Sequence, residues 1–151
     1  MAKRTLRQLM RSLASVRSEL QKHGIRDGCD YAEAIVAEAV GGIRKPSGVN
    51  KGLDIQSSLF GRIEVKCRQL PRDGRIEERV SLGNTKEGGF DHLAVVVFKP
   101  DFEVKGAVLV PYWRVWDFVQ ANPYGRISYA QACRLSDAVD ITAAVVAAAK
   151  R

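Results

Sequence analysis

The alternation of apolar and polar positions predicts helices at both ends of the chain and strands in the middle. From Thr5 to about His23, apolar residues recur at helical spacing, and Gly24 is placed to end this helix. The apolar stripe consists of Leu6, Leu9, Met10, Leu13, Val16 and Leu20. A basic stripe lies roughly opposite, formed by Arg4, Arg7, Arg11 and Lys22. That basic stripe is either a solvated face or a contact for a nucleic-acid backbone.

A second helix is predicted over residues 30–40. Asp30 is a good N-cap residue, and Glu33 at the third helical position completes a variant capping box. Gly41 and Gly42 end the helix. The loop that follows, residues 43–52, is rich in glycine and positive charge, which fits either phosphate binding or ordinary turn chemistry.

The middle of the chain reads as two pairs of strands. A hairpin spans residues 54–66, and two well-buried strands are expected at residues 92–98 and 107–110. The strongly polar segment of residues 68–87 between them is a loop or a ragged strand around residues 79–82.

Three helices are expected near the C-terminus. Pro111 suits the first turn of a helix through Gln120. Its expected anchors are Trp113, Val115, Trp116 and Val119. Ser128 and Gln131 form a capping-box signature for a short helix, and Ser136 is placed to cap a last one through Ala149.

This order of elements predicts an α/β fold with a central mixed β-sheet flanked by helices. Residues 1–151 are expected to form a single domain. Within it, residues 1–24 are the amphipathic helix, residues 30–110 the core, and residues 111–151 the C-terminal helices.

The hairpin carries the candidate chemistry: Asp54, Glu64 and Lys66. A turn centred near Leu59 places Asp54 opposite Glu64, at a Cβ separation of about 5 Å. Side chains alternate along a strand, so Glu64 and Lys66 share one face while Ile63, Val65 and Cys67 take the other. Two carboxylates can hold a divalent cation, and a neighbouring lysine can position a water molecule.

A second Glu-x-Lys occurs at Glu103-Val104-Lys105. The acid upstream, Asp91, lies at the far end of its strand, roughly 20 Å from Glu103 at the usual rise per residue. Asp101 is too close in sequence to face Glu103 across a hairpin. We therefore interpret Glu103 and Lys105 as surface charges beside a turn.

Composition points to a polyanionic partner. The net charge is +7, which favours binding to phosphate backbones, although solubility alone is the simpler explanation. The three cysteines lack zinc-site spacing and are expected to be reduced thiols in a cytoplasmic protein. No signal peptide or membrane partner is expected, because the N-terminus lacks an apolar core and residues 141–149 are too short to span a bilayer.

With the acid, the acid-x-lysine and the strand order in place, residues 30–110 resemble the restriction-endonuclease-like superfamily, called PD-(D/E)xK. Holliday-junction resolvases and many type II restriction enzymes belong to it. The resemblance assigns Glu33 as the helix acid, Asp54 as the strand acid, and Glu64 and Lys66 as the E-x-K. Leu53 stands where the family pattern has proline, and Glu38 competes with Glu33 for the helix role.

The resemblance implies a metal-dependent DNA endonuclease. Asp54, Glu64 and the Val65 carbonyl would bind Mg²⁺, with Mn²⁺ as a substitute, while Glu33 assists and Lys66 orients the attacking water. The nucleic-acid contacts would come from Arg44, Lys45, Ser47, Lys51, Arg68 and Gln69. Two alternatives stay open: an inactive nucleic-acid-binding module on the same fold, and a protein-interaction domain whose first helix packs on a partner. A homodimer is compatible with each, and DNA is not distinguished from RNA.

Overall fold

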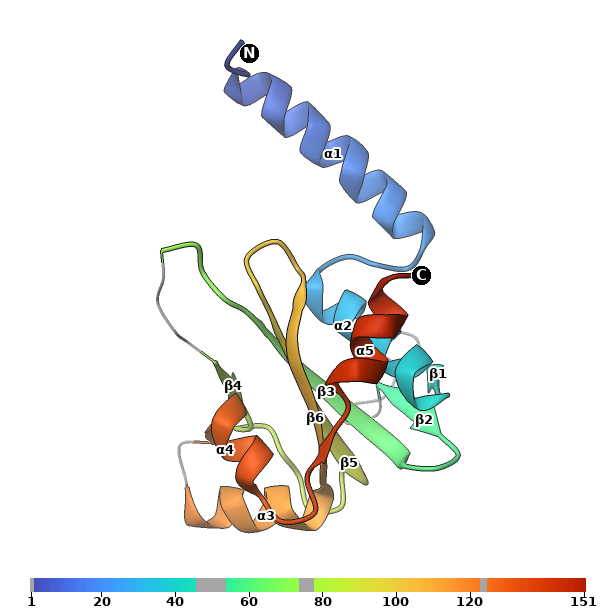
Figure 1. The fold of residues 1–151 in the computed structure, drawn as a ribbon, viewed down its shortest axis with the longest axis vertical. Coiled ribbons are helices and arrows are strands. Elements are labelled where there is room, and N and C mark those ends of the chain that lie inside the picture. Colours follow the sequence, from blue (N-terminus) through green and yellow to red (C-terminus); the bar gives the residue numbers. More distant parts are fainter. Residues whose placement is uncertain (1, 46–53, 74–77, 123–124) are drawn as a thin grey trace.

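The computed structural model describes residues 2–45, 54–73, 78–122 and 125–151 (Figure 1). Its centre is a six-stranded mixed sheet in the order β1-β2-β3-β5-β6-β8, and helices flank both faces, as the sequence predicts. β3 and β5 are parallel, and the other neighbouring strands are antiparallel. These strands are β1 (Ile43–Arg44), β2 (Ile55–Ser57), β3 (Gly61–Gln69), β5 (His92–Phe98), β6 (Val104–Pro111) and β8 (Val139–Asp140).

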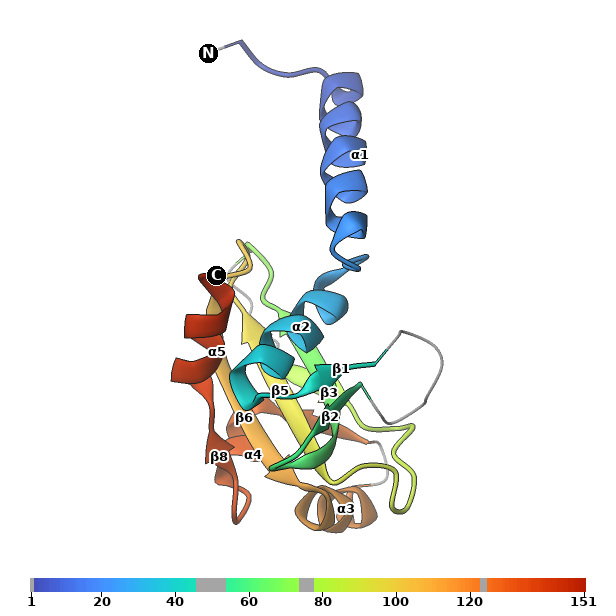
Figure 2. The same ribbon diagram turned by 90° about the vertical axis from the view of Figure 1, so that its right-hand side faces the viewer.

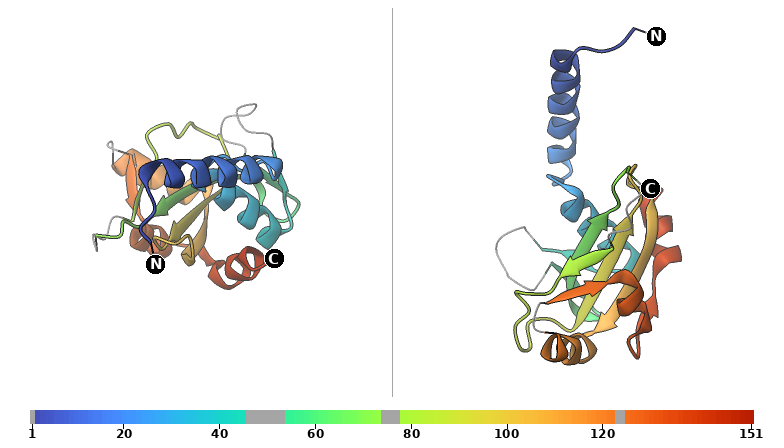
Figure 3. Two further views of the ribbon diagram at one scale, coloured as in Figure 1. Left: turned by 90° about the horizontal axis from the view of Figure 1, so that it is seen from above. Right: turned by 90° about the vertical axis from the view of Figure 1, so that its left-hand side faces the viewer.

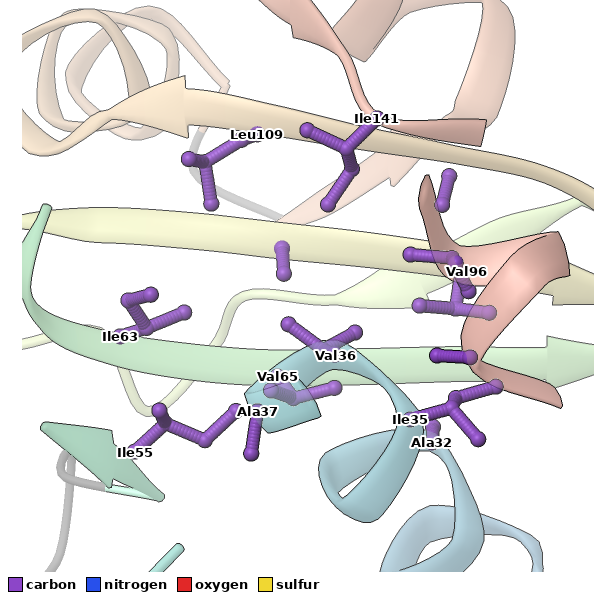
Figure 4. Close-up of a cluster of buried hydrophobic side chains, with 14 of the residues drawn as sticks. Ala32, Ile35, Val36, Ala37, Ile55, Ile63, Val65, Val96, Leu109 and Ile141 are labelled. Carbon is purple, nitrogen blue, oxygen red and sulfur yellow. The ribbon is translucent and has the colours of Figure 1, made fainter. Parts of the chain in front are cut away.

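Two hydrophobic cores lie on opposite faces of the sheet. One packs under α2 (Gly28–Val40) and α5 (Thr142–Ala149), as Figure 4 shows for Val36, Ile63 and Ile141. The other lies under α3 (Tyr112–Ala121), α4 (Tyr129–Arg134) and a small sheet of β4 (Arg79–Ser81) and β7 (Arg126–Ser128). Successive residues of β5 alternate between the two cores, which explains why this strand is a continuous apolar run.

The β2–β3 hairpin has the predicted register. Ile55 pairs with Ile63 and Ser57 with Gly61, so the turn is centred on Leu59. The Ser57 hydroxyl accepts hydrogen bonds from the backbone N–H groups of Leu59 and Phe60, at 3.3 and 3.2 Å. The turn is therefore held by its own residues.

The first helix, α1 (Leu6–Lys22), stands apart from the domain (Figures 2 and 3). Thr5 and Gln8 form a complete capping box at its start, and Gly24 follows its end with φ +71°. No residue of α1 is buried, so the predicted apolar stripe is left exposed.

The second helix begins earlier than predicted. Asp27 is its N-cap, and its side chain accepts a hydrogen bond from the Asp30 N–H at 3.0 Å. Asp30 lies in the first turn and is buried against Arg26 and Arg44. The predicted capping box of Asp30 and Glu33 is therefore wrong, because Asp30 has tertiary partners. Gly41 ends the helix, as predicted, and it adopts the left-handed conformation.

Two C-terminal predictions are also wrong. Ser136 does not cap the last helix: Val139 and Asp140 pair with β6, and α5 begins only at Thr142. Trp113 is not an anchor of α3, because it is 48% exposed and the Arg114 guanidinium stacks on its ring. The short helix capped by Ser128 and Gln131 forms as predicted.

Candidate active site

The hairpin brings Asp54 to the backbone of β3. The Asp54 Oδ2 atom accepts a hydrogen bond from the Val65 N–H at 2.8 Å. Its own N–H donates to the Ile63 carbonyl at 3.1 Å, and its carbonyl accepts from the Lys45 N–H at 2.8 Å. Asp54 is thus fixed between β1 and β3. The hairpin register, continued by one residue, sets it opposite Glu64.

Glu64 and Lys66 form an ion pair on one face of β3. Lys66 Nζ lies 3.3 Å from Glu64 Oε1, and the two side chains are 34% and 19% exposed. Their partners on β5 are Val95 and Leu93, which belong to the core under α3 and α4. Glu64 and Lys66 therefore project from the sheet face opposite α2, at the β2 side of the sheet.

Glu33 reaches the same region from α2. Its carboxyl lies close enough to Asp54 for the Asp54 charge to raise the pKa of Glu33, and its Oε2 atom accepts from Arg44 Nε at 3.0 Å. Glu38, five residues later, instead pairs with Arg151. The structure therefore places Glu33, and not Glu38, beside Asp54.

All three carboxyl groups have pKa values raised above their ordinary range. Burial is the largest cause for Glu33, Asp54 and Glu64. The negative charge of Asp54 raises the pKa of Glu33 and Glu64 further, while Arg44 and Lys66 act in the opposite direction. Perturbed carboxyl groups gathered at one place are typical of functional sites.

The donors at this place suit a hard divalent cation. The residues that the structure describes contain no group of three His, Cys, Asp or Glu side chains positioned to hold a metal ion. Magnesium needs fewer protein ligands, since it is usually held by one or two carboxylates and retains several waters. The N–H and C=O of one strand residue point to the same side of the strand. Because the Val65 N–H points toward Asp54, the Val65 carbonyl also points toward Asp54 and β2. Asp54, Glu64 and this carbonyl offer only oxygen atoms as metal ligands. Lys66 offsets only part of the negative charge of the two carboxylates.

The predicted nucleic-acid contacts fall into three groups. Arg44 is turned inward: its side chain is 20% exposed, and its guanidinium pairs with Asp30 at 2.9 Å and Glu33 at 3.0 Å. Arg68 and Gln69 are exposed at the end of β3, and Gln69 Nε2 donates to the Pro100 carbonyl at 2.6 Å. Lys45 follows β1, whereas Ser47 and Lys51 lie outside the described residues.

The sequence does not predict two features that lie near the site. One is the ion-pair network in which Arg44 joins Asp30 to Glu33. Hydrogen bonds from Arg26 and the charge of Arg44 outweigh burial and lower the pKa of Asp30. The other is a contact of 3.3 Å between the sulfurs of Cys29 and Cys67. The sequence predicts Cys67 on the strand face that it shares with Ile63 and Val65, but nothing in the sequence indicates that Cys29 lies against it.

Comparison with known proteins adds no family. No protein-family model matches the chain, and no curated protein matches it either. Within the described part of the chain, no helix is long and apolar enough to cross a membrane. The functional argument therefore depends on the site itself.

Proposed function

We propose that the protein is a Mg²⁺-dependent endonuclease of the PD-(D/E)xK type, with a restriction-endonuclease-like fold and DNA as its substrate. The observation that carries the proposal is the placement of Asp54 across the hairpin from the Glu64–Lys66 ion pair, with Glu33 in the vicinity of Asp54. The mixed sheet and the net charge of +7 support it.

Each side chain has a role that follows from its contacts. Asp54 and Glu64, with the Val65 carbonyl, would hold Mg²⁺, which when bound stabilises negative charge on the phosphate undergoing hydrolysis. Glu64 keeps the Lys66 ammonium at 3.3 Å, on the face of β3 that both side chains share. From there Lys66 donates a hydrogen bond to the attacking water and orients it.

Glu33 and Arg44 support this set from α2 and β1. Arg44 fixes the Glu33 carboxyl by its Nε contact and is itself fixed by Asp30. Glu33 is thereby held beside Asp54, whose charge raises the pKa of the Glu33 carboxyl. Arg68 and Gln69, exposed at the end of β3, are the described residues best placed to meet the nucleic-acid backbone.

The test is cleavage of a substrate panel in the presence of Mg²⁺ or Mn²⁺. The panel contains linear duplex, single-stranded and four-way-junction DNA, together with an RNA. We expect Glu64→Gln to lower cleavage by about 100-fold or more, since it removes one of the few ligands and a charge at the reaction centre.

The chain offers a matched control in its second Glu-x-Lys. Glu103→Gln makes the same substitution at an exposed residue whose carboxylate pairs with Lys99. This variant is expected to cleave like the wild type. Full cleavage by Glu64→Gln would refute the assignment. Salt-dependent DNA binding without cleavage by either protein would favour the inactive binding module instead.

A second candidate function is self-association through α1. Leu6 and Met10 are 82% and 61% exposed, and the stripe continues into an apolar groove of about 800 Å³ beside α5. The groove is lined by Leu13, Val16, Leu20, Phe102, Val104 and Val146. Pairing of α1 with a second copy would cover both stripes at once.

Analytical ultracentrifugation at low and high salt tests this candidate. A hydrophobic dimer persists at high salt and is lost in Leu9→Asp, whereas Ser12→Asp on the same helix is the charge-matched control. A monomer at all concentrations, with both variants unchanged, would exclude it.

A further inference from the structure

The contact between Cys29 and Cys67 joins two elements that are distant in the sequence. Cys29 is the second residue of α2, and Cys67 lies near the end of β3. Their Sγ atoms are 3.3 Å apart, and both thiols are free. A disulfide requires about 2.05 Å, so the sulfurs need to approach by only roughly 1.3 Å.

The two thiols differ in access. Cys29 is exposed, whereas Cys67 is partly buried and packs against the core under α2. An oxidant therefore reaches Cys29 first. Cys29 also stands in the first turn of a 13-residue helix, where the helix dipole favours the thiolate form that reacts. Cys67, whose sulfur contacts that of Cys29, can then act as the resolving thiol that completes the disulfide.

We propose that Cys29 and Cys67 are a site of reversible oxidation, at which hydrogen peroxide converts the two thiols into an intrachain disulfide. The Cys29 thiolate attacks the O–O bond, forms a sulfenic acid and releases water once the leaving oxygen is protonated. Cys67 Sγ attacks the sulfenyl sulfur, and the expelled hydroxide leaves as water with the Cys67 proton. Two thiols lose two electrons in total, and one peroxide is reduced to two waters.

The crosslink would fix α2 on β3 close to the candidate active site. Cys29 precedes Glu33 by one helical turn, and Cys67 directly follows Lys66. The proposal does not depend on the nuclease assignment, because its chemistry can be measured without a substrate.

The experiment treats the full chain with hydrogen peroxide, quenches it, unfolds it and alkylates the remaining thiols. Intact mass is expected to fall by about 2 Da before alkylation. Only Cys133 should then be alkylated, out of three free cysteines. Peptide mapping should recover Cys29 linked to Cys67, and dithiothreitol should restore all three thiols.

Variants and a denatured sample give the controls. Cys133→Ser should still form the crosslink, while Cys29→Ser and Cys67→Ser should not. The reaction should be at least about 10-fold faster in the folded protein than in denaturant, since folding supplies the proximity. Equal rates in the two conditions would overturn the proposal. The proposal would also be overturned if Cys29 formed a sulfinic acid, or an intermolecular disulfide, while Cys67 could still be alkylated.

Discussion

Asp54 Oδ2 accepts a hydrogen bond from the Val65 N–H at 2.8 Å, so an acid at the start of β2 is fixed to the backbone between Glu64 and Lys66. The position of this carboxyl is set by the strand pairing and not by a flexible partner. Backbone support of this kind holds a functional group close to its working geometry before any ligand arrives.

Neutral versions of the site acids should be more stable than the wild type at neutral pH. Burial raises the pKa of Asp54 and Glu64, so the folded protein favours their protonated forms. We expect Asp54→Asn and Glu64→Gln each to raise Tm by about 1–3 °C at pH 7, measured by thermal denaturation.

The sign of the pH dependence checks this explanation. A carboxyl with a raised pKa contributes stability below its unfolded value, here 3.8 for Asp and 4.5 for Glu, and loses it as pH rises through the folded value. The difference between variant and wild type should therefore grow from about pH 4 to neutral pH. Asp91 is the opposite case, because hydrogen bonds from Arg62 lower the pKa of its carboxyl. Asp91→Asn should therefore be less stable than the wild type at pH 7. A destabilised Glu64→Gln at pH 7 would contradict the electrostatic argument.

A divalent cation should stabilise the wild type more than either neutral variant. Ligand binding to the folded state contributes about 1.4 kcal/mol when the Mg²⁺ concentration is ten times Kd. We expect the Tm of the wild type to rise with Mg²⁺, and the rise to be lost in Asp54→Asn and Glu64→Gln. Glu103→Gln, remote in the fold, should keep it. An equal shift in all four proteins would indicate nonspecific ion effects.

Much of the site could be predicted because it depends on local rules. Strand alternation and a symmetric turn are enough to place Asp54 opposite Glu64 and to put Lys66 on the same face. The buried strand at residues 92–98 also follows from composition, since it is apolar on both faces.

The errors come from contacts between distant segments. The sequence predicts Asp30 as the N-cap, but Asp30 pairs with Arg44 on β1 and Asp27 caps the helix instead. Ser136 precedes an apolar run, but the pairing of Val139 with Leu109 delays the helix. The periodicity of apolar residues predicts neither the contact of Asp30 with Arg44 nor the pairing of Val139 with Leu109.

Arg44 should matter more for stability than for nucleic-acid affinity. Its removal takes a shared positive partner from Asp30 and Glu33, whose side chains are 5% and 14% exposed, although Asp30 keeps its contact with Arg26. We expect Arg44→Ala to lower the free energy of unfolding by about 2–4 kcal/mol in urea denaturation. Arg68→Ala removes an equal charge from an exposed position and should cost about 0.5 kcal/mol or less. Similar stability of the two variants would refute the structural role of Arg44.

Two glycines with positive φ angles should differ in their tolerance of alanine, because only one of them faces a neighbour. Gly61 (φ +73°) begins β3, and an added Cβ would collide with the Asp91 carboxyl, which accepts the Arg62 N–H at 2.7 Å. Gly41 (φ +66°) ends α2 with nothing within 4 Å of an added Cβ. Gly41→Ala should therefore cost only the strained backbone, about 1 kcal/mol, and Gly61→Ala about 2–4 kcal/mol in urea denaturation. Since Gly61 closes the hairpin that sets Asp54 against Glu64, Gly61→Ala should also weaken the stabilisation by Mg²⁺, and Gly41→Ala should not. Equal costs for the two variants would mean that Asp91 moves aside freely, and that its contact does not hold the hairpin.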